Sequence, residues 1–209
     1  MQKFLVYLFD FDGTLFDSIR ACKYVFKKAY ANLNIEINED DVVGWTREPL
    51  GVSYKRIGAP QEKFAKFFKD ITDYVNSKEA TELTDLYPET YDTVIDLRMA
   101  EADLAVVTSN TASHVRDVLK KFEMQKDFFS VIVGNQETNK VKPDPEPIFK
   151  ALEMMNYHGD LKDVCYVGDA LNDCLAAVNA GVVPVLVDRH DEYRDTSYLR
   201  IKSLAELLS

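Results

Sequence analysis

The segment Asp10-Phe11-Asp12-Gly13-Thr14 places two carboxylates two positions apart, directly after an apolar run that ends at residue 9. Two carboxylates that leave the end of a strand in this way can converge on one site, where one acts as a nucleophile or metal ligand and the other as an acid or base. Gly13 would permit the tight backbone turn that follows. The alternative is a turn in which Asp and Gly only end the strand.

Two further segments could bind an anion. Thr108-Ser109-Asn110 follows the apolar run 104–107 and precedes a helical pattern, so its hydroxyl and backbone amides could hold a phosphate. Lys142 lies in a proline-rich loop, from which its ammonium could offset the repulsion between a phosphate and a negatively charged nucleophile. The alternatives are an ordinary helix cap for the first segment and a solvated surface lysine for the second.

A fourth segment carries Asp169 and Asp173, four positions apart at the predicted start of a helix. Residues with this spacing share one helix face, and with Asp10 they could hold Mg²⁺, which prefers carboxylates, water and phosphate oxygens. The alternative is an acidic first turn favoured by the helix dipole. All four segments fall at the carboxyl ends of predicted strands or in the loop just beyond, so a parallel sheet would bring them together.

Short apolar runs alternate with helical patterns along most of the chain. Strands are expected at 3–9, 104–107, 131–133, 164–167, 183–187 and 198–201, and helices at 112–122, 147–155 and 171–180. This alternation predicts an α/β fold with a Rossmann-like, doubly wound parallel sheet.

The segment 17–88 differs, because it contains strong helical stripes and no convincing strand. We expect an α-helical cap domain over 17–88, inserted into an α/β core formed by 1–16 and 89–209. Because the insertion follows the first strand, it would lie over the carboxyl edge of the sheet, where open α/β sheets bind ligands.

The composition excludes several classes of protein. The formal net charge of -10 argues against a nucleic-acid-binding surface, which needs clustered Lys and Arg. The apolar run 4–9 is too short to span a membrane. The 3 cysteines are widely spaced and fit a reducing compartment. We therefore expect a cytoplasmic protein with neither nucleic-acid nor membrane partners, and the sequence identifies no protein partner.

In this order, the four segments resemble those of the haloacid dehalogenase superfamily of aspartate-nucleophile hydrolases, over nearly the whole chain. The helical insertion is similar to the cap of the branch that contains phosphoglycolate phosphatase and β-phosphoglucomutase. The dehalogenases themselves use no magnesium and lack the second aspartate of the first segment. The presence of Asp12, with Asp169 and Asp173, therefore argues against carbon–halogen cleavage.

The resemblance implies a role for each segment. Asp10 would attack phosphorus and become an aspartyl phosphate, while Asp12 would protonate the leaving oxygen and then activate water. Thr108 would bind the phosphoryl group, with help from backbone amides of the two residues that follow it. Lys142 would stabilise both the nucleophile and the phosphate.

The resemblance also implies the metal ligands and the reaction. Asp10, the backbone carbonyl of Asp12, and Asp169 would bind Mg²⁺, with Asp173 as an additional or outer ligand. In the insertion, Arg47 could contact the anionic end of a substrate. We expect a Mg²⁺-dependent phosphatase that hydrolyses a small phosphorylated metabolite, as a phosphoglycolate phosphatase does. The alternatives are a sugar-phosphate mutase similar to β-phosphoglucomutase and a binding or regulatory protein without catalysis.

Overall fold

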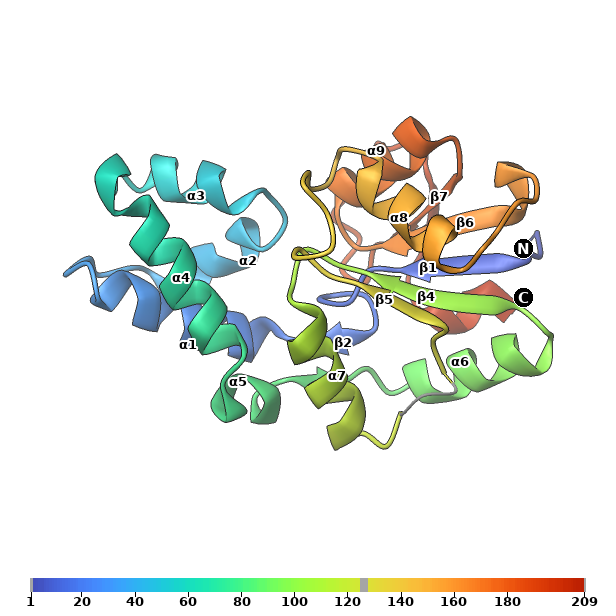
Figure 1. Cartoon of the computed structure of the whole chain (residues 1–209), viewed down its shortest axis with the longest axis horizontal. Helices are drawn as coiled ribbons and strands as arrows, with labels where there is room; N and C mark the ends of the chain where they lie inside the picture. Colours follow the sequence, from blue (N-terminus) through green and yellow to red (C-terminus); the bar gives the residue numbers. More distant parts are fainter. Residues whose placement is uncertain (1, 125–127, 209) are drawn as a thin grey trace. The chain divides into compact units, whose positions relative to one another are not determined.

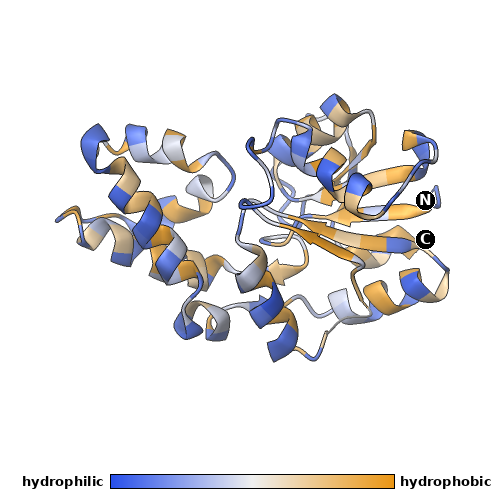
Figure 2. Cartoon of the chain, in the orientation of Figure 1, coloured by the Kyte–Doolittle hydropathy of each residue, from blue (hydrophilic) through white to orange (hydrophobic). Residues whose placement is uncertain are grey.

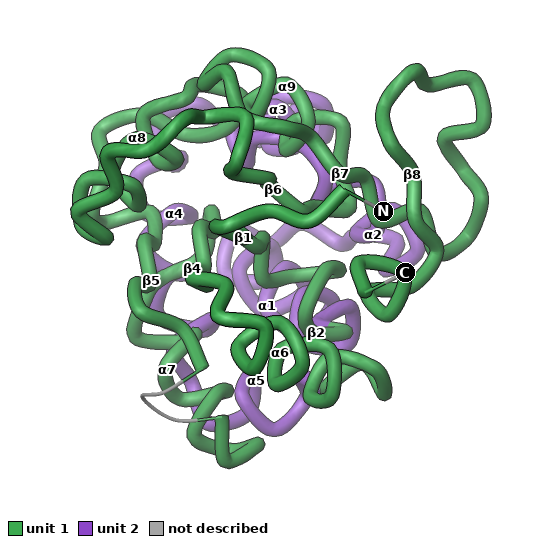
Figure 3. The backbone as a smooth tube through the Cα atoms, turned by 90° about the vertical axis from the view of Figure 1, so that its right-hand side faces the viewer, with its two compact units in different colours: residues 1–17, 86–209 green, residues 18–85 purple. Residues whose placement is uncertain are grey.

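The computed structural model describes residues 2–124 and 128–208. The chain divides into two compact units, shown in green and purple in Figure 3. Unit 1 comprises Met1–Asp17 and Leu86–Ser209, and unit 2 comprises Ser18–Asp85. Unit 2 is thus an insertion into the sequence of unit 1.

Unit 1 is built on a parallel sheet of six strands in the order β5-β4-β1-β6-β7-β8 (Figure 1). The strands are β1 (Val6–Phe9), β4 (Asp103–Val107), β5 (Val131–Val133), β6 (Val164–Gly168), β7 (Val183–Val187) and β8 (Leu199–Ile201). The chain adds β4 and β5 on one side of β1 and then adds β6, β7 and β8 on its other side, so the strand order reverses at β1. Open α/β sheets bind ligands at such a switch point, beyond the carboxyl ends of the strands, here those of β1, β4 and β6.

The central strands are almost entirely apolar because helices cover both faces of the sheet; the exception is the exposed Asp103 at the start of β4. In β1 all four residues are buried, and Figure 2 shows the hydrophobic colouring of the strands. Tyr7 and Phe9 belong to one core cluster, whereas Val6 and Leu8 belong to the other. This alternation is the side-chain period of a β-strand.

Four helices and a short 3₁₀ helix form the two outer layers of unit 1. On one face, α8 (Glu146–Met154) and α9 (Leu171–Ala180) pack against the sheet. On the other face lie α6 (Thr90–Met99), α7 (Ala112–Lys121) and the 3₁₀ helix η4 (Leu204–Leu208). The predicted doubly wound α/β fold is confirmed. The sequence patterns did not predict α6.

Unit 2 is helical and has its own aromatic core. Its elements are α1 (Ile19–Ala31), η1 (Glu39–Asp41), α2 (Val42–Trp45), α3 (Leu50–Arg56), η2 (Gln61–Lys63), α4 (Phe64–Val75) and α5 (Lys78–Glu82). The ring of Phe67 lies 4.6 Å from that of Tyr30 and 4.8 Å from that of Tyr54, and Trp45 packs on Tyr30 at 5.6 Å. Trp45 is therefore a core residue of this unit.

Two short strands, β2 (Phe16–Asp17) and β3 (Asp85–Leu86), pair with each other. Strand β3 falls in the segment where the sequence indicated no strand. Its two residues are too few to produce a recognisable alternation of polar and apolar side chains. Within the described residues, every helix is too short or too polar to span a membrane.

Candidate active site

Asp10, Lys142 and Asp173 form a buried group of charges in unit 1. The Lys142 Nζ lies 2.9 Å from Asp10 Oδ1 and 2.6 Å from Asp173 Oδ1. Asp10 is the first residue after β1, where its amide donates to the Val167 carbonyl at 2.8 Å. Asp173 belongs to the first turn of α9, beyond the carboxyl end of β6. Three segments far apart in sequence thus meet at one edge of the sheet.

Lys142 is not a solvated lysine, since its side chain is only 8% exposed. A buried charge requires partners, and this ammonium has two carboxylates and the hydroxyl of Tyr166, at 3.2 Å. The Tyr166 hydroxyl in turn donates to the Val107 carbonyl at 2.7 Å. Tyr166 was missed by the sequence reasoning, because within β6 it reads as an ordinary core residue.

The pKa values follow from this burial and pairing. Burial raises the pKa of Asp10 to about 7, against the opposing effect of the Lys142 ammonium. Burial by itself lowers the pKa of Lys142, but the carboxylates of Asp10 and Asp173 outweigh it, so that pKa lies well above its ordinary value. Lys142 therefore remains a cation beside Asp10.

The first segment makes a tight turn that brings it against Asp169. Gly13 has φ +76°, and a Cβ on it would lie 2.4 Å from Asp169 Oδ2. Any side chain here would collide with that carboxylate and would also be strained. The glycine thus lets the backbone after Asp12 approach the fourth segment closely.

Asp10, Asp169 and Asp173 can each offer one carboxylate oxygen to a common point. The three oxygens all lie within 4.8 Å of one another. Both oxygens of Asp173 already have partners, because Oδ1 contacts Lys142 and Oδ2 accepts from the Ala170 amide at 3.0 Å. A donor set of hard carboxylate oxygens fits a magnesium ion.

The second segment meets the first through side chains. The Thr108 hydroxyl accepts from the Asn110 amide at 3.0 Å, which leaves its own hydrogen able to donate to a phosphoryl oxygen. The Asn110 side-chain Nδ2 donates to Asp12 Oδ2 at 3.1 Å. Ser109 is exposed in the same loop.

The guanidinium of Arg189 contacts the turn that follows Asp12. Its Nη2 donates to the Thr14 carbonyl at 2.9 Å, its Nη1 lies 2.5 Å from Glu89 Oε1, and its guanidinium stacks 3.7 Å above the ring of Tyr87. Glu89 Oε1 also accepts from the amide of Leu204 at 3.4 Å. Arg189 was missed by the sequence reasoning, because it belongs to none of the four segments.

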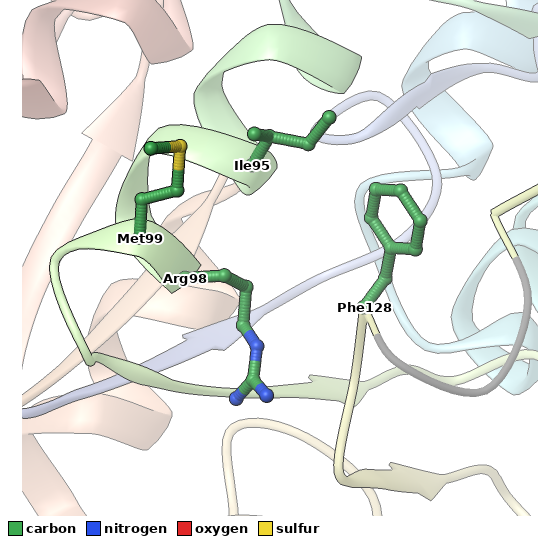
Figure 4. A pocket seen from close by; sticks show the side chains of 4 residues that line it. All are labelled: Ile95, Arg98, Met99 and Phe128. Carbon is green, nitrogen blue, oxygen red and sulfur yellow. The ribbon is translucent and has the colours of Figure 1, made fainter.

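Unit 1 also has an open pocket of about 310 Å³, lined by Ile95, Arg98, Met99 and Phe128 (Figure 4). These residues precede the starts of β4 and β5, so the pocket lies toward the amino ends of strands. The Arg98 guanidinium donates to the Ala102 carbonyl at 3.4 Å. The lining offers no carboxylate, hydroxyl or thiol, and we assign it no chemistry.

Of the predicted site residues, Arg47 is the one that belongs to unit 2. It follows α2, and its amide donates to the Gly44 carbonyl at 3.4 Å. All the others, from Asp10 to Asp173, belong to unit 1. Contact between Arg47 and a substrate stays a prediction.

The fold and the site define an α/β protein with a buried lysine–carboxylate group at the switch point of a parallel sheet. The family model described as "Haloacid dehalogenase-like hydrolase" matches residues 7–187. The chain belongs to this family and is an enzyme of the hydrolase class, which confirms the resemblance inferred from the four segments.

Individual relatives agree with this assignment. The chain is 32% identical over 190 residues to "Putative pyrophosphatase PpaX" of Caldanaerobacter subterraneus, covering 89% of this chain and 82% of that protein. It is 29% identical to the phosphoglycolate phosphatase of Pasteurella multocida, with 88% and 86% covered. Among solved structures, "Putative haloacid dehalogenase-like hydrolase" from Bacteroides fragilis matches with a TM-score of 0.87 and 25% identity, over 98% of this chain and 100% of that one.

Proposed function

We propose that this chain is a Mg²⁺-dependent phosphatase that hydrolyses a small phosphomonoester through an aspartyl phosphate on Asp10. The observation that carries the proposal is the buried Lys142 ammonium, 2.9 Å from Asp10 Oδ1. A cation held beside a carboxylate nucleophile offsets its repulsion of an anionic phosphate. Thr108, directly after β4, lies at the same edge of the sheet and would supply a hydroxyl for the phosphoryl oxygens.

In the first step, an oxygen of Asp10 attacks phosphorus and the bond to the leaving oxygen breaks. The leaving oxygen takes a proton from Asp12, so that the product departs as an alcohol. Phosphoryl transfer depends mainly on positioning and charge neutralisation. Lys142 and Thr108 would supply both, by holding the nucleophile and the phosphoryl oxygens in line.

In the second step, water attacks the phosphorus of the aspartyl phosphate. Asp12, now a carboxylate, accepts the proton of that water, and the bond between phosphorus and Asp10 breaks. Inorganic phosphate leaves, and both aspartates return to their starting states. The net reaction is hydrolysis of one phosphomonoester bond.

The carboxylates of Asp10, Asp169 and Asp173, with the backbone carbonyl of Asp12, would hold Mg²⁺. The ion would supply positive charge to the phosphoryl oxygens. Because both oxygens of Asp173 have partners within the protein, we assign it the outer position of this set. Asp10 and Asp169 would then be the inner carboxylate ligands.

The substrate class is inferred from the relatives and agrees with the formal net charge of -10. Proteins named pyrophosphatase and phosphoglycolate phosphatase are both similar to this chain, and their names identify small phosphate compounds. Unit 2 would serve as a helical cap that excludes water from the site. Its Arg47 would contact the anionic end of the substrate.

The direct test is turnover of p-nitrophenyl phosphate by the purified chain, with Mg²⁺ and with EDTA. We expect activity only with the metal, and a loss on the order of 10⁴-fold in kcat for Asp10→Asn, because the nucleophile is removed. The matched control is Asp96→Asn, which changes an exposed aspartate of α6. Equal activity of Asp10→Asn and the unchanged protein would overturn the proposal.

The substrate is tested with a panel of pyrophosphate, phosphoglycolate and β-glucose 1-phosphate. Release of inorganic phosphate from phosphoglycolate, a phosphomonoester, without isomerisation of β-glucose 1-phosphate is the expected result. Release from pyrophosphate alone would identify an anhydride as the substrate and overturn the ester assignment. Isomerisation of β-glucose 1-phosphate without phosphate release would identify a mutase instead. The variant Arg47→Ala should raise KM for the preferred small substrate more than it changes kcat.

A further inference from the structure

The side chain of Asn110 reaches across from the second segment to the first. Its Nδ2 donates to Asp12 Oδ2 at 3.1 Å, between residues 98 positions apart. Asn110 lies in the short loop between β4 and α7, directly after Thr108 and Ser109. The sequence suggested that this segment holds phosphate through its backbone, and it did not suggest a side-chain contact with the acid–base residue.

The orientation of the Asn110 amide is fixed by its other contacts. The Thr111 amide donates to Asn110 Oδ1 at 2.8 Å, so the oxygen of the side chain must lie there and the NH₂ group must face Asp12. The Asn110 backbone is also held, because its N–H donates to the Thr108 hydroxyl at 3.0 Å and its carbonyl accepts from Asn135 at 2.8 Å. The backbone N–H and C=O of Asn110 and both polar atoms of its side chain therefore have hydrogen-bond partners.

The close fit of the neighbouring loop preserves this arrangement. A Cβ on Gly134 would lie 2.8 Å from the Asn110 carbonyl oxygen and 2.5 Å from the Ala112 nitrogen. Only a glycine lets the backbone after β5 approach the start of α7 this closely. These contacts fix the position of Asn110 next to Asp12.

This contact makes the two oxygens of Asp12 different. Asp12 Oδ2 accepts from an amide NH₂, which does not give up a proton under enzymatic conditions. Asp12 Oδ1 is buried and has no hydrogen-bond partner within the described part of the chain. Oδ1 is therefore the oxygen that the described residues leave without a partner, and it would exchange a proton with a substrate oxygen or a water that reaches it, while Oδ2 is held in place.

We propose that Asn110 is a positioning residue that holds Asp12 so that its Oδ1 protonates the leaving oxygen and later accepts the proton of water. This inference rests on the proposed function and deepens it. It assigns a proton-transfer atom and a residue that aims it. General acid catalysis depends on a correctly placed proton donor, so a loosened Asp12 would slow only reactions that need one.

The test compares substrates with leaving groups of different basicity. Nitrophenolate leaves readily without a proton, whereas an alkoxide needs one in the transition state. We expect Asn110→Ala to lower kcat/KM for an alkyl phosphate such as glycerol 3-phosphate by on the order of 10²-fold, and to lower that for p-nitrophenyl phosphate much less. The ratio kcat/KM reports the first phosphoryl transfer, so a slow second step does not mask the difference.

Two further variants make the result decisive. Asn110→Asp keeps the acceptor for the Thr111 amide but removes the donor to Asp12, and should show the same dependence on the leaving group even if Asn110→Ala folds poorly. Asn32→Ala is the matched control, because it removes an amide-to-carboxylate hydrogen bond of 3.0 Å to Asp70 on an exposed surface. It should leave both substrates unchanged.

The outcomes separate this inference from the proposed function. Equal losses for both substrates, or no loss for either, in an otherwise active protein would overturn the role of Asn110 alone. If the unchanged protein and Asp10→Asn hydrolyse neither substrate, the proposed function fails and the inference fails with it. A loss that grows with the basicity of the leaving group supports both.

Discussion

In unit 1 the ammonium of Lys142 lies between the buried carboxylates of Asp10 and Asp173, whereas the ion pairs of unit 2 lie at its surface. The Lys142 side chain is 8% exposed, but those of Lys69 and Asp73, which pair on α4, are 72% and 57% exposed. Water and salt screen exposed pairs and make them contribute little. A buried charge must instead be paired by groups of the protein, because its removal from water costs free energy. Such buried, perturbed charges cluster at functional sites. Burial thus distinguishes the charges of the candidate site in unit 1 from the solvated ion pairs of unit 2.

The largest expected effect is that of Lys142→Met. The variant would leave Asp10 and Asp173 buried without a cation, which should lower the free energy of unfolding by about 3 to 5 kcal/mol and abolish activity. Urea denaturation in EDTA measures the first, and p-nitrophenyl phosphate turnover the second. The control, Lys140→Met, changes a lysine of the same loop that is 64% exposed. If Lys140→Met lost as much stability and activity as Lys142→Met, burial would not distinguish the two lysines.

A smaller effect is expected for Arg189→Met, because Arg189 and Glu89 are only partly exposed, at 14% and 19%. Loss of the hydrogen bonds to Glu89 and to the Thr14 carbonyl should cost about 1 to 3 kcal/mol of unfolding free energy. It should also reduce kcat/KM, because the turn after Asp12 loses its support. Arg194→Met, at a 73% exposed side chain, should change neither the denaturation midpoint nor the turnover.

Asp188 tests the comparison between buried and exposed charges through the pH dependence of protein stability. Burial by itself raises its pKa, but donation from the amides of Tyr193 and Glu192 and from Arg200 more than offsets this, so the pKa lies below its ordinary value of 3.8. A carboxyl whose pKa is lowered by folding stabilises the protein above its unfolded pKa, and this stabilisation is lost as the pH falls through the folded pKa.

Asp188→Asn should therefore cost about 1 to 2 kcal/mol at pH 7 and should weaken the loss of stability below about pH 4. Denaturation midpoints measured from pH 7 downward check both. Asp195→Asn, at an exposed position of the same loop, is the control. An unchanged pH profile for Asp188→Asn would show that the ionisation of this carboxyl does not contribute to the loss of stability in acid.

The smallest effect is expected for Lys69→Gln in α4. Glutamine keeps the helix propensity and much of the side-chain length, so only the exposed pair with Asp73 is lost. The midpoint of thermal unfolding should not change measurably, at low or at high salt. A clear decrease at low salt would mean that surface pairs in unit 2 matter more than their exposure suggests.

Much of the α/β core could be predicted because its signals are local. A strand covered on both faces must be apolar throughout, so the runs at 131–133 and 183–187 coincide with β5 and β7. Helix α6 was missed because its buried face mixes Thr90 and Thr93 with Val94 and Leu97. Its apolar residues therefore form no clear stripe of helical period.

The sequence by itself indicated which segments could carry chemistry. Asp10, Thr108 and Asp169 each follow an apolar strand, and the carboxyl ends of parallel strands share one edge, so their neighbourhood follows from the fold class alone. The carboxylates and hydroxyl at those ends, together with Lys142 in the loop after β5, already indicated chemistry on a phosphate. This much depends only on local pattern and on the rule that parallel strands point the same way.

Only the tertiary structure decided which atoms meet. Nothing local indicates that Lys142 contacts both Asp10 and Asp173, that the Asn110 side chain reaches Asp12, or that Arg189 donates to a carbonyl 175 positions away. These contacts depend on strand register and on side chains packed to within tenths of an ångström, which are properties of the whole folded unit. The four segments therefore became a site with assigned atoms only when the sheet had aligned them.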